Sequence, residues 1–288
     1  MPSLLSQLWR RASTRLCLLL ALAFAVTAGW GEAQAWRHRH AGANAPFNLV
    51  QSTRRNLPPA FKTGQLLGTD NLGRDVAARL AQGARIAFQI GVSTSLLSIA
   101  LGALLGLVAG YFGRVADALV QSLCTVFSAI PSILLIIALT LLLGKGLVAL
   151  FVSLSLTTWV STCRQVRAET LRQRHLPYVL AARGLGYSHA RILLRHILPN
   201  TAHLLLVAFS TRFPVAVSTE VLVSFLGIGA QDQPSWGVML NNARAGLWRG
   251  CWWEMASVSL ALFLLLLAFN HLADTLRDIL DPTLKPST

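Results

Sequence analysis

The sequence has little charge, and most of what it has is of one sign. Charged residues are 12% of the 288 residues, with 25 basic and 11 acidic side chains and a formal net charge of +14. An ordinary soluble domain carries about 25% charged residues. With 54% hydrophobic residues in long apolar runs, this deficit predicts an integral membrane protein. We attribute the positive charge to membrane topology and lipid contact and expect no nucleic-acid partner, because no nucleic-acid motif accompanies it.

Catalytic and metal-binding signatures are also missing. The sequence has no G-x-x-x-x-G-K-[ST] phosphate loop, no G-x-S-x-G or H-E-x-x-H motif and no kinase signature. None of the four cysteines forms a C-x-x-C pair, and His38 and His40 have no acidic or cysteine partner nearby. We therefore expect a chain that is not an enzyme and that binds no cofactor and no metal.

Long apolar segments predict an all-α, polytopic membrane protein with about six transmembrane helices. The expected spans are residues 16–30, 87–111, 118–143, 146–163, 201–228 and 255–270. The first is short for a span, which needs roughly 20 apolar residues, and with the A-x-A sequence behind it could be a cleaved signal peptide. An uncleaved helix is favoured because further spans follow. The basic start and six spans place the N- and C-termini in the cytoplasm.

The segment after the first span conflicts with this topology. Residues 31–86 are expected outside, yet they carry eight basic residues: Arg37, Arg39, Arg54, Arg55, Lys62, Arg74, Arg79 and Arg85. Exported loops are usually poor in Arg and Lys. Two interpretations of the charged end of this segment stay open. Asp70, Arg74 and Asp75 form a local charge network, or the region is an amphipathic helix at the membrane interface.

Several residues within or beside the spans are candidates for packing or for a translocation path. Gly102, Gly106 and Gly110 recur every fourth residue, which favours close helix packing in lipid. Pro131 bends its span and either lines the path or is a plain kink. Glu220 either pairs structurally or lines the path. Four tryptophans are expected to form an aromatic belt at the outer boundary: Trp236, Trp248, Trp252 and Trp253.

The polar stretch 164–200 contains a predicted helix, a tight turn and a second helix. Pro177 suits the first turn of a helix, Gly186 can end it, and Ser188 can cap the next. The small side chains of Ala181 and Ala182 let another surface approach closely. Such a helix suits docking into a groove on a partner protein. The alternative is a solvated basic loop that only obeys the positive-inside rule.

The spacing of this stretch resembles the cytoplasmic signature loop of ABC importer permeases, E-A-A-x3-G-x9-I-x-L-P. Leu180 replaces the glutamate, and His196 stands at the isoleucine position. The wording A-A-R-G-L-G and R-H-I-L-P-N is similar to the dipeptide, oligopeptide and nickel branch of that family. Two more blocks resemble the same branch: G-T-D-x-x-G-R-D-V at residues 68–76 and an E-x-x-L-S-F-L-G-x-G pattern at 220–229, with Val223 at its leucine position.

This resemblance implies a type I ABC importer permease, specifically the second, C-type permease subunit of a peptide or nickel system in the bacterial inner membrane. It divides the chain into an anchor helix with an extracytoplasmic loop (1–86), a transmembrane permease domain (87–282) and a short tail (283–288). It implies that the loop 164–200 couples the chain to its ATPases. The coupling residues would be Tyr178, Ala181, Ala182, Arg183, Gly186 and Pro199.

The partners that the resemblance implies are a second homologous permease, two cytoplasmic ABC ATPases that hydrolyse ATP, and an extracytoplasmic solute-binding protein. Membrane lipid surrounds the assembly. The cargo would be a dipeptide, a longer peptide, or nickel or a metal chelate. The alternative function is an ATP-independent channel or secondary carrier, which would transport without any ATPase.

Overall fold

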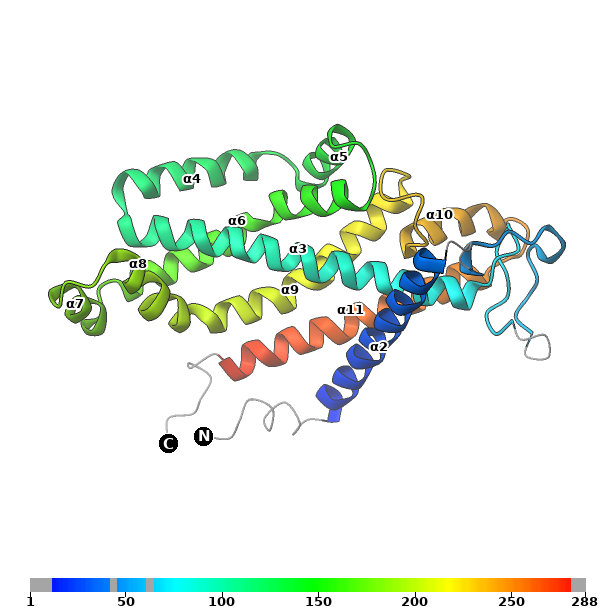
Figure 1. The fold of residues 1–288 in the computed structure, drawn as a ribbon, viewed down its shortest axis with the longest axis horizontal. Coiled ribbons are helices and arrows are strands. Elements are labelled where there is room, and N and C mark those ends of the chain that lie inside the picture. Colours follow the sequence, from blue (N-terminus) through cyan, green and yellow to red (C-terminus); the bar gives the residue numbers. More distant parts are fainter. Residues whose placement is uncertain (1–11, 42–45, 61–64, 281–288) are drawn as a thin grey trace.

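The computed structural model describes residues 12–41, 46–60 and 65–280, and these are helical with short connections (Figure 1). The tail predicted at 283–288 lies outside the described residues. No strand occurs within the described ranges, where only two isolated β-bridges form. The helices are α2 (Ala12–Ala41), α3 (Val76–Phe112), α4 (Arg114–Ala129), α5 (Ser132–Leu142), α6 (Leu147–Gln173), α7 (Pro177–Gly184), α8 (His189–Ile192), α9 (Leu198–Phe225), α10 (Trp236–Leu247) and α11 (Trp253–Leu280).

Among the described residues, five helices are long and apolar enough to cross a membrane, and six spans result if α4 and α5 count together. This agrees with the predicted polytopic all-α class. The helices are longer than the predicted spans. In particular, residues 86 and 87, between which the domain boundary is predicted, both lie inside the continuous helix α3. The polar first turns of α3 stay helical because their charged side chains find partners within the protein.

Helix α2 packs along α3 and α11, so the first predicted span is part of the bundle. The Gln82 amide donates a hydrogen bond to the Gly31 carbonyl at 3.1 Å, and the ring of Phe24 lies edge-on to Trp236 at 6.0 Å. At the start of α2, Thr14 is 3.5 Å from the His271 ring near the end of α11. The beginning of α2 and the end of α11 therefore lie on the same side of the bundle.

The glycine repeat of α3 forms its close contact with α6. A Cβ atom at Gly102 would lie 2.7 Å from the Trp159 carbonyl oxygen, and one at Gly106 would lie 2.6 Å from the Cys163 carbonyl oxygen. At Gly110 the corresponding distance to the Thr170 Cβ is 2.6 Å. The two backbones approach too closely for any larger side chain, which confirms the predicted packing face.

Pro131 separates two helices instead of bending one. α4 ends at Ala129 and α5 begins at Ser132, and the two axes differ by 91°. Proline cannot donate the helix hydrogen bond, and its ring excludes the preceding residue from helical geometry. The expected kink is therefore a full break, and the Pro131 side chain is exposed at that corner.

The predicted aromatic belt is wrong for two of its four tryptophans. Trp236 is 1% exposed and its indole N–H donates to the Leu80 carbonyl at 3.0 Å. Trp253 is also buried, and its N–H donates to the Thr69 carbonyl at 3.0 Å. Both indoles sit in the core because a backbone acceptor satisfies each N–H there. Trp248 and Trp252 remain exposed, with Trp248 at 95%.

Candidate docking site on α7 and the buried charge clusters

The sequence signals around α7 produce the local structure that they predict. Pro177 occupies the first turn of the helix, where its missing N–H has no helical partner to lose. Gly186 has a φ of +77°, and the Tyr187 N–H bonds back to the Ala182 carbonyl at 3.1 Å, which is a Schellman-type ending. Ser188 then caps α8 by accepting from the Arg191 N–H at 3.4 Å. The helix–turn–helix prediction is confirmed.

One face of α7 is buried against the rest of the permease. Val179 is fully buried and Ala182 nearly so, in a cluster made by the inner ends of α3, α6 and α9. Its members are Ala103, Leu107, Tyr111, Val166, Val179, Ala182, Ile192 and Ile197. Ala182 therefore packs inside this chain and is not available to another protein. The two alanines that are predicted to let another surface approach are thus placed differently, since Ala182 is buried and Ala181 is exposed.

The opposite face of α7 is open. Leu180 is half exposed, Ala181 is exposed, and Leu185 is 73% exposed. Arg183 and Gly186 also lie on the exposed side. An unpartnered leucine beside small residues and an arginine is the surface that a protein groove accepts. The predicted small apolar patch exists, but it centres on Ala181 and Leu185.

Polar contacts tie the loop to the helices on both sides of it. The Tyr178 hydroxyl donates to the Gln173 side chain at 2.9 Å and accepts from Asn200 at 3.3 Å. The guanidinium of Arg183 lies 4.7 Å from the ring centre of Tyr111 on α3, a cation–π distance. These contacts join α7 to the end of α6, the start of α9 and the end of α3. The loop is therefore a fixed part of the bundle.

Helix α9, which follows this site in the chain, begins at Leu198 and Pro199. Pro199 stands in the first turn of α9, directly after a π-helical turn at Leu193–Ile197. The Arg174 guanidinium donates to the Gly110 carbonyl at 3.1 Å, which links the end of α6 to the end of α3. Tyr178, Ala181, Ala182, Arg183, Gly186 and Pro199 thus all lie at one end of the molecule, shown at the α7 end in Figure 1.

Glu220 lies toward the other end of α9 and is buried. Ser224 donates a hydrogen bond to its carboxylate at 2.8 Å, and Ser235, the residue that caps α10, also bonds to it. The carboxylate therefore joins α9 to α10. Of the two interpretations of Glu220, this geometry favours structural pairing. Pro131 is exposed and shares no such contact, so the structure does not bring Pro131 and Glu220 into one lining.

The end of the molecule opposite α7 carries buried ion pairs that account for part of its excess of arginine. The Asp70 carboxylate is buried, with Arg74 Nε at 2.6 Å and Arg79 Nε at 3.8 Å. Arg85 pairs with Glu32 of α2 at 3.3 Å. The predicted Asp70–Arg74 network is confirmed, whereas Asp75 instead caps α3 by accepting from the Ala77 N–H at 2.8 Å. Because Arg74, Arg79 and Arg85 are paired with carboxylates inside the protein, we do not count them when the positive-inside rule is applied to this segment.

Arg79 was not singled out from the sequence, although a signal for it existed. The excess of arginine in a segment expected outside is itself evidence that some of these residues are paired within the protein. Arg79 is 2% exposed, and its guanidinium also donates a hydrogen bond to the Asn48 side-chain oxygen at 3.2 Å. The pairing could not be assigned because Asn48 lies 31 residues away in sequence.

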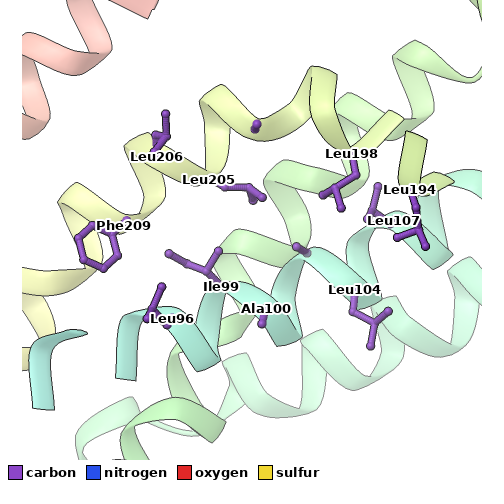
Figure 2. Close-up of a pocket in the computed structure, with 12 residues that line it drawn as sticks. Leu96, Ile99, Ala100, Leu104, Leu107, Leu194, Leu198, Leu205, Leu206 and Phe209 are labelled. Carbon is purple, nitrogen blue, oxygen red and sulfur yellow. The ribbon is translucent and has the colours of Figure 1, made fainter. Parts of the chain in front are cut away.

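An apolar groove of about 650 Å³ runs between the inner halves of α3 and α9 (Figure 2). Only aliphatic and aromatic side chains line it, including Leu96, Leu104, Leu198, Leu206 and Phe209. No side chain in it can pair with the charged ends of a polar ligand. Within the described residues, no group of three or more His, Cys, Asp or Glu side chains could hold a metal ion.

A bundle of membrane-length helices with a rigid helical loop at one end is the type I permease fold of ABC importers. The fold matches a chain of the inward-facing MetNI methionine ABC transporter with a TM-score of 0.53, over 70% of this chain and 96% of that chain, at 20% identity. A second crystal form of that transporter gives a TM-score of 0.52.

Residues 102–286 match the family described as the binding-protein-dependent transport system inner membrane component. The chain belongs to this family of multi-pass inner-membrane proteins. It is 37% identical over 244 residues to the dipeptide transport system permease protein DppC of Bacillus subtilis, covering 84% of this chain and 76% of that protein. It is 41% identical over 239 residues to the glutathione transport system permease protein GsiD of Pectobacterium atrosepticum, covering 83% and 78%.

Proposed function

We propose that this chain is the second, C-type permease subunit of an ATP-driven importer that carries peptides across the inner membrane. The support is its similarity to permeases of dipeptide, oligopeptide and glutathione systems. Glutathione is itself a small peptide, so the three names agree on one cargo class. None of these relatives is named for nickel or a metal chelate, and peptide is therefore the cargo that we favour.

The assembly that we propose contains a second homologous permease, two cytoplasmic ABC ATPases and an extracytoplasmic binding protein. The family description itself names dependence on a binding protein. This chain has no phosphate loop in its sequence, so we assign ATP hydrolysis to the partner ATPases and no catalytic activity or cofactor to this subunit.

In the proposed orientation, the α7 end faces the cytoplasm, together with the start of α2 and the end of α11. Around α7, Arg183, Arg191 and Arg195 are exposed, as the positive-inside rule favours for a cytoplasmic surface. At the opposite end, Arg74, Arg79 and Arg85 are held by carboxylates and are not free charges. Arg54, Arg55, Arg244 and Arg249 are exposed at that end as well, so the proposed orientation rests mainly on the resemblance of the α7 loop to the cytoplasmic loop of the family.

The exposed face of α7 is the proposed contact with an ATPase, and its buried face carries the motion inward. When the ATPases close, they push on Ala181 and Leu185. Val179 and Ala182 pack tightly on α3, α6 and α9, so a displacement of α7 moves these spans as a unit. Rigid-body movement of this kind alternates access to a central pathway.

The test uses Leu185→Asp, because Leu185 is 73% exposed and its replacement leaves the internal packing intact. Ala182→Arg and Gly186→Asp are poorer tests. Ala182 is buried, and Gly186 has a left-handed backbone that other residues rarely adopt. The control is Leu66→Asp, an equally drastic change at a half-exposed leucine of the outer loop.

Tagged protein is purified in mild detergent, and the co-purifying chains are identified. We expect Leu185→Asp to lose most of the ATPase while retaining the second permease, and Leu66→Asp to retain both. Peptide uptake in the Leu185→Asp strain should fall at least about tenfold, which corresponds to roughly 1.4 kcal/mol of lost docking free energy. Peptide transport by this chain in liposomes without any ATPase would instead establish the channel or secondary-carrier alternative.

A further inference from the structure

Arg212 lies in the middle of a membrane-spanning helix. It is 14 residues from Leu198 and 13 from Phe225, the first and last residues of α9. At about 1.5 Å per residue, each end of the helix is roughly 20 Å away. The bilayer hydrocarbon is about 30 Å thick, so this guanidinium belongs to a residue near its midplane.

Arg212 has no counter-ion within the described part of the chain. Its side chain is half-buried, and among the described residues neither a carboxylate nor a hydrogen-bond acceptor contacts it. Two other arginines of the long helices that are buried or partly buried have carboxylate partners. Arg79 has Asp70, and Arg167 forms a two-pronged pair with Asp117. An unmatched arginine at this depth is therefore an exception in this molecule.

One flank of Arg212 on α9 is not covered by the rest of this chain, whereas Ala208 and Ala216, one turn before and one turn after it, are buried. Val215 and Leu222 follow it at helical spacing, and each is 47% exposed, with Thr219 half-buried between them. The other flank of Arg212 is buried, where Phe213 stacks on Phe269 at 3.9 Å between ring centres. In the membrane, an arginine faces a protein interior or a water-filled cavity, because exposure to lipid is too costly.

Two hydroxyl groups lie on the same uncovered flank of α9 as Val215 and Leu222, and both are partly exposed. The Ser218 hydroxyl donates to the Pro214 carbonyl at 2.9 Å, and the Thr219 hydroxyl donates to the Val215 carbonyl at 2.7 Å. Their hydrogens are thus used within the helix, and their oxygen lone pairs remain free to accept. This part of α9 therefore presents one guanidinium and two oxygens that can accept hydrogen bonds. Lipid tails cannot form hydrogen bonds with them, whereas water or a polar ligand can.

We propose that Arg212 lines the translocation path and binds the carboxylate of the peptide in transit. Guanidinium and carboxylate match in a two-pronged hydrogen-bonded pair, and every peptide with a free C-terminus carries this group. A site that binds the C-terminal carboxylate recognises no peptide side chain, so it accepts peptides of different sequence. This inference rests on the proposed peptide-importer function and adds a substrate-contacting residue to it.

The first test asks whether position 212 is in water. Arg212→Cys is made in a Cys251→Ser background, because the other three cysteines are buried. The control is Leu260→Cys, at a 58% exposed position of α11. In the assembled transporter, a charged methanethiosulfonate reagent should label position 212 at least about tenfold faster than position 260, and excess dipeptide should slow labelling. Equal, slow labelling at both positions would overturn the proposal.

The second test measures ATP-dependent dipeptide uptake by the complete transporter in vesicles. A charged hydrogen bond contributes enough that Arg212→Gln should lower maximal uptake roughly 10- to 100-fold, while Arg212→Lys, which keeps the charge but not the two-pronged geometry, should lose less than Arg212→Gln. Lys145→Gln, which removes an exposed cation between α5 and α6, should stay within twofold of wild type. Arg212→Gln at the wild-type rate would overturn the proposal.

A carboxylate of the second permease is the other possible partner of Arg212, and the same samples distinguish it. In that case, Arg212→Gln reduces recovery of the second permease, and position 212 is unreactive in the assembly. Both results would contradict binding to the cargo. Wild-type uptake is measured alongside. If the wild type itself takes up no peptide, the proposed function is wrong. If the wild type and Arg212→Gln are equally active, only the role of Arg212 is wrong.

Discussion

Replacing Asp70 by asparagine should loosen the outer loop without altering its shape. The Asp70 carboxylate accepts from the Leu72 and Arg74 N–H groups at 2.9 and 2.8 Å, and an asparagine oxygen can still accept both bonds. The ion pair with the Arg74 Nε at 2.6 Å is lost, however, because the second atom of the amide is a donor. Arg79 also loses its carboxylate neighbour at 3.8 Å.

The size of the effect follows from burial. Removing one partner of a buried ion pair costs about 3–5 kcal/mol. Two features favour the lower end of this range. The Arg74 side chain keeps 12% exposure, and the Glu254 carboxylate lies close enough to interact with Arg79. We therefore expect about 3 kcal/mol, which is a change of roughly 100-fold in the equilibrium between closed and open loop.

Proteolysis measures this opening directly. The Asn56 N–H bonds to the Asp70 carbonyl at 3.0 Å and the Thr69 N–H to the Leu57 carbonyl at 3.0 Å, so loosening of Asp70 frees the chain around Arg54 and Arg55. Trypsin cleavage there should accelerate roughly 100-fold when the cleavage rate follows the open population. Cleavage fragments from purified protein in lipid nanodiscs are followed by mass spectrometry.

The matched control is Asp75→Asn, which removes the same charge five residues away. Asp75 caps α3 through a bond from the Ala77 N–H, and asparagine is an equally good cap. Its cleavage rate should stay within about threefold of wild type. Equal acceleration in both variants would show that net charge, and not the buried pair, holds the loop, and the reasoning would then be refuted.

Two further changes test the packing of the core. Gly106→Leu should destabilise the protein by about 1–3 kcal/mol, because a Cβ atom at this position would lie 2.6 Å from the Cys163 carbonyl oxygen. The control is Leu104→Ala, at an exposed position, which should leave the melting temperature in detergent nearly unchanged. Trp236→Phe should cost about 1–3 kcal/mol by removing the bond to the Leu80 carbonyl, whereas Trp248→Phe, 95% exposed, should shift the melting temperature by little; equal shifts would contradict the buried bond.

The sequence predicts the spans and the α7 loop because their signals are local. Hydropathy needs only a window of residues, and Pro177, Gly186 and Ser188 each act on their own backbone. The orientation of α7 is not local. Whether Ala181 or Ala182 is buried depends on where α3, α6 and α9 lie, and the helix pattern alone permits either.

The misplaced start of α3 and the misassigned tryptophans have the same origin. Hydropathy counts Arg79 and Trp236 as polar or interfacial residues, but each has a partner distant in sequence that satisfies it inside the protein. No helix is predicted between the spans 201–228 and 255–270, where the structure has α10. These features depend on contacts across 31 to 156 residues, which no local pattern contains.

The length of α3 has a mechanical consequence. With 37 residues, the helix is roughly 55 Å long and extends beyond a hydrocarbon layer of about 30 Å at both ends. Its outer end joins the Asp70 ion pairs and its inner end joins the α7 cluster. It is therefore a lever arm: because the helix is long and continuous, a tilt of only a few degrees at the α7 end displaces the other end by ångströms. Spin labels placed at the two ends of α3 would report that tilt as a change in their distances to labels on neighbouring helices.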